Sequence, residues 1–531
     1  MGDVIVPGAD APRSGRVDVL VALVPLCAFL AAVAVFVLAP AYRLDDFPLD
    51  DAWIHQVYAR SLSSGHGFAY NEGTQEAGFT SPLWVVVTAP AHWLAPLGGD
   101  SAVAAGVKGV GVLLGALSVL LAYAIARSLT GSRRAAAIAA ALVAVDPRLT
   151  FSALSGMETV LLVALWLGVV WATLARRFVL AVVCCGLMPV ARPESVVLVP
   201  LVLAGIAVAG DGCDGVWRRA STWAVLGAPA LAWSTFCLAV TGRCLPNTFY
   251  LKAAPFAVGP AMAGVAWRNL VQHGWGSQPF LWLAIVAFAA WLAFRGGRRS
   301  WFLGATLLLA PVLYLFAVLS SRSFSLDGYY WTRWVDPAVI VLTFAMALGL
   351  ALLTGAGGWL PRKRALAVLL AAAAALGILA SLPRWAKSVT ERRARLASDG
   401  RTIRRTNVEP ALWIRDHTAP ESVVGGMDAG ALRYFGDRRT VDLMGLNNAP
   451  IALGRSDRRV AASTIDWIVA FPFWLDGTGL ADLFEPQMTF RMPEAEYTVC
   501  PCPEHATVLI ARHHGGREIV DPPTGTGGPP K

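Results

Sequence analysis

Long apolar runs separated by short polar segments fill the chain up to residue 382. A helix that crosses a lipid bilayer needs about 20 mostly apolar residues, and twelve runs approach that length. These candidate segments are residues 17–40, 81–97, 102–126, 135–146, 158–175, 178–190, 194–210, 220–240, 278–294, 301–320, 334–355 and 365–382. The apolar core of the first run is too long for a signal peptide, so we expect an uncleaved anchor. The pattern predicts a polytopic α-helical membrane protein.

The composition supports this prediction. Of 531 residues, 56% are hydrophobic and 15% are charged, whereas soluble proteins carry roughly 45–50% apolar and about 25% charged residues. A soluble enzyme, a disordered chain and a small disulfide-rich module are therefore excluded. The net charge of +9 comes from short basic clusters beside apolar runs, which is typical of charges that orient a protein in the bilayer. We accordingly expect the lipid bilayer, and no nucleic acid, as a partner.

The basic clusters also predict an orientation. They are Arg176-Arg177, Arg218-Arg219, Arg298-Arg299 and Arg362-Lys363-Arg364. Cytoplasmic loops carry an excess of Lys and Arg, so these clusters belong inside. The segments that then fall outside are 42–80, 241–277, 321–333 and everything after residue 382. An inside N-terminus and an outside C-terminus require an odd number of crossings, so we expect eleven, with one of the twelve segments re-entrant or half-length.

The last 150 or so residues differ in character, because charge rises and short β-like runs alternate with turns and helical stretches. The β-like runs are Ser422–Gly425, Trp467–Phe471 and Ala506–Ala511. We expect three parts: a transmembrane domain over 1–382, an extracytoplasmic α/β domain over 383–520, and a disordered Gly/Pro-rich tail over 521–531.

The first outer loop, residues 42–80, is the most informative segment. Its apolar residues Trp53, Ile54, Val57, Tyr58 and Leu62 follow helical spacing on one stripe. This spacing predicts an amphipathic helix in the membrane interface, with Asp50 and Asp51 in its first turn and an end near Gly65.

Asp50 and Asp51 have three interpretations. Aspartate is a preferred N-cap, and negative charge suits a helix N-terminus. A carboxylate at the membrane surface is also suited to act as a general base toward an acceptor hydroxyl. Paired carboxylates can equally hold a divalent cation. The second acidic pair, Asp45-Asp46, adds a further candidate, and spacing alone does not decide.

Several motifs resemble, in order, a GT-C glycosyltransferase family, and most closely the mycobacterial terminal arabinofuranosyltransferases. In the first loop they are Asp50-Asp-Ala-Trp-Ile, Tyr58-Ala-Arg, Gly65-His-Gly-Phe, Tyr70-Asn71 and Glu76-Ala-Gly-Phe-Thr-Ser-Pro-Leu-Trp84. Later motifs are Ser155-Gly-Met-Glu-Thr159, Ala191-Arg-Pro-Glu194, Leu245-Pro-Asn-Thr-Phe-Tyr-Leu-Lys252, Asp428-Ala-Gly and Val441-Asp-Leu-Met-Gly-Leu446. The matches run from about residue 44 to about residue 450.

The resemblance implies a GT-C-like membrane fold, an extracytoplasmic active site and a polyprenyl-phosphate sugar as donor. It also implies that one aspartate of the first-loop pair is the catalytic base, with Asp50 slightly preferred over Asp51. The sequence departs from the family at Trp53-Ile54-His55-Gln56 and matches it only loosely at Trp331-Thr332-Arg333. These departures leave the identity of the sugar open.

Other candidate residues complete the predicted site. Lys252 and Arg333 fall in outer loops and are suited to bind the donor phosphate, although interfacial snorkelling explains them equally well. Ionisable groups at membrane depth are costly unless paired, which makes Glu158, Arg192 and Glu194 either substrate-binding residues or a structural ion pair. The remaining substrate-binding candidates are His66, Glu76 and Asn247, with His55 as a further possible contact to sugar or phosphate. No spacing of His, Cys and Asp indicates zinc, and a divalent cation is left open.

Together these features predict a multi-pass glycosyltransferase of the cell membrane. It would transfer a sugar, arabinofuranose by the resemblance, from a polyprenyl-phosphate carrier to an extracytoplasmic cell-envelope glycan or glycolipid. Two alternatives from other classes are a transporter or lipid flippase and a non-catalytic envelope-assembly protein. A transporter would show a repeat of its membrane segments and an ionisable site at the midplane, and the sequence shows neither.

Overall fold

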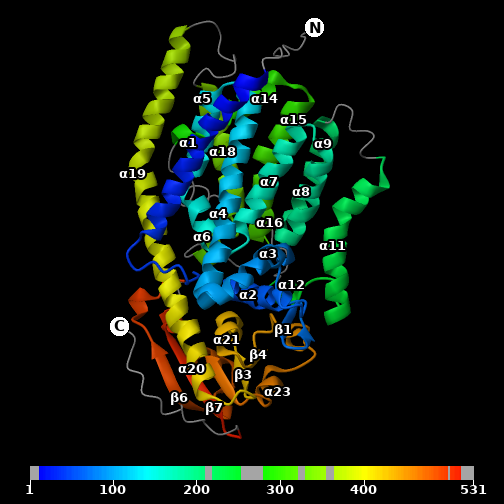
Figure 1. Cartoon of the computed structure of the whole chain (residues 1–531), viewed down its shortest axis with the longest axis vertical. Coiled ribbons are helices and arrows are strands. Elements are labelled where there is room, and N and C mark those ends of the chain that lie inside the picture. Colours follow the sequence, from blue (N-terminus) through cyan, green and yellow to red (C-terminus); the bar gives the residue numbers. More distant parts are fainter. Residues whose placement is uncertain are drawn as a thin grey trace.

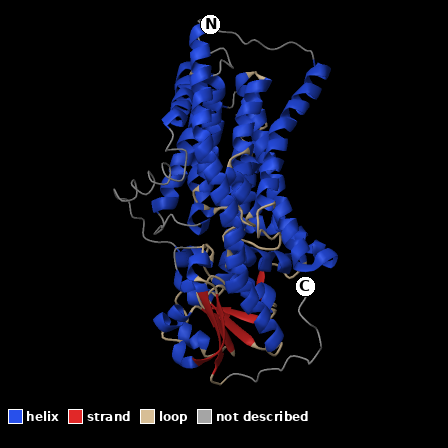
Figure 2. Ribbon diagram, turned by 90° about the vertical axis from the view of Figure 1, so that its left-hand side faces the viewer, coloured by secondary structure: helices blue, strands red, loops and turns tan. Residues whose placement is uncertain are grey.

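A computed structural model of the chain describes residues 11–209, 218–252, 279–320, 329–353, 364–499 and 503–515. Apolar helices form an elongated bundle, and a smaller part that contains a β-sheet lies against one end of it (Figures 1 and 2). The predicted tail at 521–531 lies outside the described residues. The boundary at residue 382 stays a prediction.

The bundle consists of helices that are buried on one face or all round. They are α1 (Ala11–Val37), α4 (Ala95–Thr130), α5 (Arg133–Ala144), α6 (Pro147–Leu154), α7 (Thr159–Leu174), α8 (Phe178–Ala191), α9 (Val199–Ala209), α11 (Ala220–Thr241), α14 (Pro279–Arg295), α15 (Gly297–Gly304), α16 (Ala310–Ser320), α18 (Asp336–Leu353) and α19 (Arg364–Ile403). Among the described residues, five helical stretches are long and apolar enough to cross a membrane, or six if the bent pair α5 and α6 is one span. Four shorter apolar helices accompany them, and the number of eleven crossings stays a prediction.

The segment 81–97 is not a separate straight helix. It forms α3 (Pro82–Thr88), the 3-10 helix η1 (Ala89–Leu94) and the start of α4, which is broken at Gly98 and Gly99 by non-helical backbone angles. In Figure 1, α3 lies beside α2 (Asp50–Ser63) at the end of the bundle that faces the sheet. Which of the twelve predicted segments does not cross stays a prediction.

Short elements connect the bundle helices at that same end and elsewhere. They are β1 (Ala69–Asn71), β2 (Thr74–Gln75), η2 (Pro193–Leu198), α12 (Asn247–Lys252), the π-helical turn η4 (Ala305–Leu309) and α17 (Tyr329–Thr332). Strands β1 and β2 pair as a small antiparallel hairpin after α2.

The C-terminal part holds a five-stranded sheet in the order β4-β3-β5-β7-β6. Its strands are β3 (Val423–Gly426), β4 (Arg439–Asp442), β5 (Trp467–Ala470), β6 (Phe484–Arg491) and β7 (Thr507–His513). Strand β3 pairs in parallel with β4 and β5, while β7 runs antiparallel to β5 and β6. The three predicted β-like runs correspond to β3, β5 and β7.

Short helices surround this sheet. They are η5 (Arg404–Val408), α20 (Glu409–His417), α21 (Ala429–Gly436), α22 (Ala449–Ala452), α23 (Arg458–Ala462), α24 (Pro472–Thr478), η6 (Ala481–Leu483), η7 (Glu494–Glu496) and η8 (Pro503–Ala506). Helix α19 has 40 residues, a length of about 60 Å at 1.5 Å per residue. It runs along the bundle and leads directly into the sheet-containing part (Figure 1).

Helix α2 is more buried than its apolar stripe predicts. Nine of its residues are buried, including the polar His55 and Gln56. Helix α3 and the 3-10 helix η1 contact α2 at the end of the bundle, and α21 contacts it from the sheet-containing part (Figure 1). The helix and its first-turn Asp50 and Asp51 are as predicted, whereas its position in the membrane interface stays a prediction. Its polar side is not open to solvent, because α21 covers it.

The contact between α2 and α21 is very close. A Cβ atom on Gly430 would lie 2.3 Å from the backbone oxygen of Asp50 and 2.9 Å from the backbone nitrogen of Ile54. Only glycine fits there, so the motif Asp428-Ala-Gly marks a helix packing contact.

Side-chain hydrogen bonds tie the first outer loop to the sheet. The Tyr58 hydroxyl donates to Asn447 Oδ1 at 2.8 Å, and the Tyr70 hydroxyl donates to the Ala429 carbonyl at 2.6 Å. Asn71 and Thr440 exchange two hydrogen bonds of 2.9 Å. This network makes the loop and the sheet one packed unit.

Candidate active site

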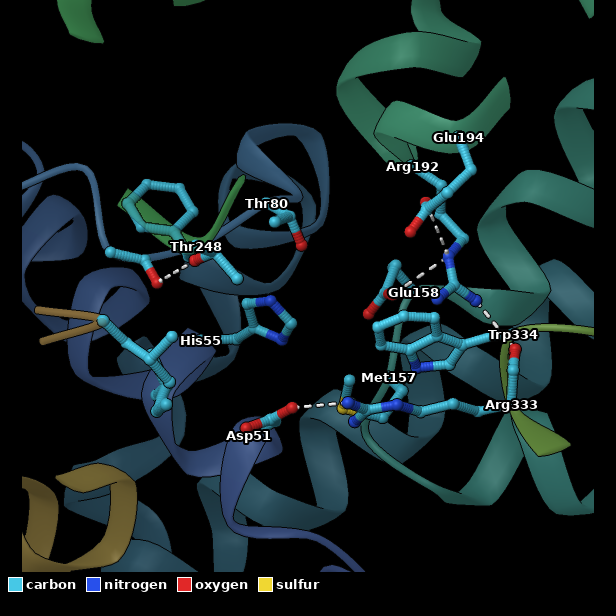
Figure 3. A pocket seen from close by; sticks show the side chains of 14 residues that line it. Asp51, His55, Thr80, Met157, Glu158, Arg192, Glu194, Thr248, Arg333 and Trp334 are labelled. Atoms are coloured by element: carbon cyan, nitrogen blue, oxygen red, sulfur yellow. Dashed lines mark hydrogen bonds and ion pairs between the residues drawn. The ribbon is translucent and has the colours of Figure 1, made fainter. Parts of the chain in front are cut away.

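A pocket lies where the first outer loop, the end of the bundle and the sheet-containing part meet, with about 480 Å³ of space when its opening to solvent is included. Its walls come from α2, the turn after β2, the turn before α7, the start of η2, α12 and the segment between α17 and α18. The lining residues are Asp51, Ile54, His55, Gly78, Phe79, Thr80, Met157, Glu158, Arg192, Glu194, Thr248, Arg333, Trp334 and Leu446. Figure 3 shows these side chains converging from elements far apart in sequence.

Asp51 and Arg333 form an ion pair in this pocket. Arg333 Nη2 lies 2.5 Å from Asp51 Oδ2. The Arg333 side chain is 3% exposed, and its Nε and Nη1 atoms have no hydrogen-bond partner among the described residues. Its guanidinium also lies 4.9 Å from the ring centre of Tyr330. Two buried donors therefore remain available to an anion beside the Asp51 carboxylate.

A second charged group lies on the same wall. Arg192 Nε is 3.4 Å from Glu158 Oε1 and 3.8 Å from Glu194 Oε2. Arg192 Nη1 donates to the carbonyl of Arg333 at 2.7 Å, so this group also fixes the backbone that carries Arg333. The ion pair expected from the sequence is therefore present, and binding of substrate by these three residues stays a prediction.

The local backbone explains the position of Glu158. Gly156 has φ +75°, and a Cβ atom there would lie 2.6 Å from the Phe47 ring. The Gly156 carbonyl accepts a hydrogen bond of 2.9 Å from Trp84 Nε1. Glycine thus permits the turn that directs Glu158, the residue before α7, into the pocket.

His55 is a pocket residue whose importance the sequence indicates only weakly. It lies four positions after Asp51, so both residues occupy the same face of α2. Its side chain is buried and its Nδ1 atom has no hydrogen-bond partner among the described residues. Burial lowers the pKa of His55 from its ordinary value, which favours the neutral ring. The helical spacing from Asp51 was the signal that could have placed it in the site.

Asp50 points away from the pocket. Its Oδ2 accepts a hydrogen bond of 2.7 Å from the backbone N–H of Gly430, and its Oδ1 accepts one of 2.8 Å from that of Ala431. Burial and the nearby charge of Asp428 raise the pKa of Asp50 to about 8. Neither aspartate caps α2, since the helix begins at Asp50 itself. Asp50 instead satisfies the N-terminus of α21, a different helix.

Four other predicted residues lie outside the lining of the pocket. Asn247 Nδ2 donates to Glu76 Oε2 at 3.2 Å and to the Leu446 carbonyl at 3.2 Å, which ties α12 to the loop before α3. His66 is exposed beyond the end of α2. Lys252 is the last residue of α12, and its side chain is outside the described part of the chain.

The sheet-containing part closes one wall of the pocket through Leu446. The Asp442 carboxylate accepts hydrogen bonds from the backbone N–H groups of Gly445 and Asn447 at 2.9 and 2.8 Å. These bonds fix the turn that carries Leu446. The part of the chain that the structure describes holds no group of three or more His, Cys, Asp or Glu suited to a metal.

Comparison with solved structures shows the fold. ArnT from Cupriavidus metallidurans, bound to undecaprenyl phosphate, matches with a TM-score of 0.56 at 15% identity, over 94% of this chain and 99% of that chain. The archaeal oligosaccharyltransferase AglB from Archaeoglobus fulgidus, in complex with an inhibitory peptide and a dolichol-phosphate, matches with a TM-score of 0.52 at 14% identity, over 84% of this chain and 69% of that chain. These structural neighbours are GT-C glycosyltransferases.

The sequence comparisons are narrower. A family model described as a domain of unknown function (DUF8728) matches residues 400–509, which include the whole of strands β3 to β6. No curated protein matches the sequence. The predicted fold class, a GT-C-like polytopic helical membrane protein with a C-terminal α/β domain, is confirmed by the structural matches.

Proposed function

We propose that this protein is a membrane glycosyltransferase that moves a sugar from a polyprenyl-phosphate carrier to an acceptor hydroxyl group, with Asp51 as the general base. The observation that carries the proposal is the Asp51–Arg333 pair in a pocket at the end of an apolar helix bundle. A carboxylate and a guanidinium with donors that the described residues leave unoccupied are the two groups that this reaction needs. Undecaprenyl phosphate and dolichol-phosphate in the structural neighbours favour a polyprenyl-phosphate donor.

The chemistry follows from these two residues. The Asp51 carboxylate takes the proton of the acceptor hydroxyl as its oxygen forms a bond to the anomeric carbon of the sugar. The bond between that carbon and the phosphate oxygen breaks, and its electron pair leaves with polyprenyl phosphate. Arg333 stabilises the charge on the departing phosphate through Nε and Nη1, the two donors that have no partner among the described residues. Lys252 stays a predicted second contact to the phosphate.

Basic residues at the far end of the bundle support an extracytoplasmic site. Arg127 and Arg133 both pair with Asp18 in α1, and Arg299 donates to Ser128 near the end of α4. This end, where α5, α14 and α15 are labelled in Figure 1, is opposite to α2 and the sheet. Since Lys and Arg accumulate on the cytoplasmic side, we place the pocket on the outer side of the cell membrane.

The position of the pocket disfavours a transporter. Transport sites lie near the bilayer midplane, between repeated halves of the protein. Here the charged residues lie at one end of the bundle, and Leu446 of the sheet-containing part helps to enclose them. The finer assignments, arabinofuranose as the sugar and an envelope glycan or glycolipid as the acceptor, rest on the motif resemblance alone.

The test is sugar transfer by purified protein with a panel of polyprenyl-phosphate sugars and an envelope extract as acceptor. We expect Asp51→Asn to lower kcat by about 100-fold or more, since general bases contribute roughly 10²–10⁴-fold. Glu72→Gln removes an exposed carboxylate of the same loop and serves as the matched control. Equal transfer by wild type and Asp51→Asn would contradict the assignment of the base.

A further inference from the structure

Three buried polar side chains in the pocket carry atoms that the described residues leave without a hydrogen-bond partner. They are Arg333, with Nε and Nη1, Glu158, with Oε2, and His55, with Nδ1. Leaving a buried polar group unsatisfied costs about 1–3 kcal/mol. The proposed reaction uses the Arg333 donors for phosphate, whereas it gives no role to Glu158 or His55.

Glu158 and His55 approach the pocket from opposite walls. Figure 3 shows the His55 ring and the Glu158 carboxylate directed toward one another across the open space. Both residues are less than 5% exposed, at 4% for His55 and 3% for Glu158. A ligand between them would therefore meet a carboxylate oxygen on one side and an imidazole nitrogen on the other.

These two atoms suit hydroxyl groups. The Oε2 atom of an ionised carboxylate only accepts hydrogen bonds, and the Nδ1 atom of a neutral imidazole accepts or donates one according to its tautomer. A hydroxyl group both donates and accepts, so it satisfies either atom. The side chains of Met157 and Trp334 also line the pocket and offer an apolar surface to the C–H groups of a sugar ring.

The charges already present disfavour a charged sugar. The Glu158 carboxylate is paired with Arg192 at 3.4 Å, and Asp51 is paired with Arg333 at 2.5 Å. With Glu194 the lining holds three carboxylates and only two guanidinium groups, so a sugar carboxylate would add to an existing excess of acid. A sugar ammonium would have to compete with Arg192 and Arg333 for carboxylates that these arginines already pair. A buried charge without its own partner is strongly unfavourable, whereas a hydroxyl group adds no charge.

We propose that Glu158 and His55 form a sugar subsite, which holds an uncharged sugar of the donor through two of its ring hydroxyl groups. This inference rests on the proposed function, because it assumes that the pocket receives a polyprenyl-phosphate sugar. It assigns one wall to the phosphate, at Arg333, and the space between Glu158 and His55 to the sugar ring.

The experiment measures binding by the purified full-length protein in detergent, with transfer assayed in parallel. The probes are bare polyprenyl phosphate, carriers with an uncharged sugar, the same carriers lacking one ring hydroxyl at a time, and carriers with a uronic acid or an amino sugar. The variants are Glu158→Gln, His55→Ala and, as a control, His514→Ala, which alters an exposed histidine remote from the pocket in sequence and fold.

We expect the uncharged sugar to tighten binding about tenfold or more over bare polyprenyl phosphate. Removal of either contacted hydroxyl should weaken binding to wild type by about tenfold, since a hydrogen bond contributes about 1 kcal/mol and one to a charged group more. In Glu158→Gln or His55→Ala, the hydroxyl that the replaced side chain contacts should no longer matter, so its removal should weaken binding little more. His514→Ala should behave as wild type.

Two results would overturn the inference. One is a hydroxyl-removal penalty that is the same in wild type and in both pocket variants. The other is a uronic acid or amino sugar carrier that binds as tightly as the uncharged one. A different result would separate the two proposals. If the loss of binding on hydroxyl removal depends on Glu158 and His55 but no sugar is transferred, the sugar subsite is supported and the proposed enzymatic function is contradicted.

Discussion

At the scale of single residues, Arg333 joins two parts of the proposed reaction. One of its nitrogen atoms donates a hydrogen bond to the Asp51 carboxylate. Two others have no hydrogen-bond partner among the described residues, so they are suited to bind an anion. Its backbone is fixed in turn by Arg192. A planar guanidinium can serve both partners at once, which the single ammonium group of lysine does less well.

We therefore expect Arg333→Ala to lower kcat/KM by about 100-fold or more, the size reported for loss of a preorganised donor to a developing negative charge. Arg333→Lys should retain part of the activity, because the charge remains while the fork is lost. The measurement is donor-dependent kinetics of transfer, with Arg439→Ala, an exposed arginine, as the control. If the Arg333→Ala protein keeps wild-type kinetics, Arg333 does not bind the donor phosphate.

Asp50 gives a prediction about pH. Its pKa is raised to about 8 by burial and by Asp428, so the folded state binds this proton more tightly than the unfolded chain. The free energy of unfolding should then fall as pH rises from about 4 to 8, by at most about 1.4 kcal/mol per pH unit from this group. Thermal unfolding of wild type and Asp50→Asn between pH 4 and 9 tests this.

The expected result is a shallower decline of thermal stability with pH in Asp50→Asn. Other buried acids, such as Glu76 and Asp442, also have raised pKa values, so only the difference between the two proteins is diagnostic. Identical slopes in both proteins would show that Asp50 does not titrate in this range.

The sequence predicted the positions of some candidate site residues better than those of others. Glu158, Arg192 and Glu194 stood out because charges among apolar residues are costly, and all three line the pocket. Local spacing cannot distinguish Asp50 from Asp51 as the base. The distinction comes from α21, whose backbone N–H groups bind the Asp50 carboxylate. Which aspartate is the base stays a prediction, and we now favour Asp51.

At the scale of elements, the contact between α2 and α21 is the feature on which the site depends. The two helices approach so closely at Gly430 that a methyl group would overlap the backbone of Asp50. Asp51 follows Asp50 directly, so displacement of one moves the other. The sheet-containing part thus positions the proposed catalytic base without contributing it.

Gly430→Ala should accordingly lower transfer by about tenfold or more and destabilise the contact by roughly 1–3 kcal/mol, the usual cost of overpacking. Gly477→Ala is the matched control, since a Cβ atom there meets nothing within 4 Å. Limited proteolysis of the first outer loop, together with transfer kinetics, provides the measurement. A Gly430→Ala protein that resists proteolysis and transfers normally would contradict this dependence.

Some elements were not predicted from the sequence because they lack a distinctive apolar pattern. Strand β6 is exposed at most positions and contains Pro486, as edge strands do, so it lacks an apolar signal. Strand β4 alternates over only four residues. Segment 81–97 has the composition of a membrane helix, yet glycines and packing beside α2 bend it. An apolar composition predicts that a segment is shielded from water. It does not tell whether lipid or the rest of the protein surrounds that segment.

At the scale of the whole molecule, the short basic segments between bundle helices predict orientation. Arg127, Arg133 and Arg299 lie at the end of the bundle opposite to the pocket, where Asp18 pairs with the first two. The sheet-containing part should therefore lie outside the cytoplasm.

Protease added to intact spheroplasts should cut a tag placed after the sheet-containing part, while a tag before α1 should survive until the membrane is opened. The two tags control for each other in the same cells. The reverse pattern would place the pocket in the cytoplasm and exclude an extracytoplasmic acceptor.

The hydrogen bond between Asp50 and Gly430 spans 380 residues of sequence, and this separation has a consequence for biosynthesis. At roughly 5–20 residues per second, the ribosome completes Gly430 between about 20 and 80 s after Asp50. During that interval the first loop has left the ribosome and lacks the helix that holds it. A chain released before this point would insert its apolar segments and remain inert, so every active copy has been translated at least as far as α21.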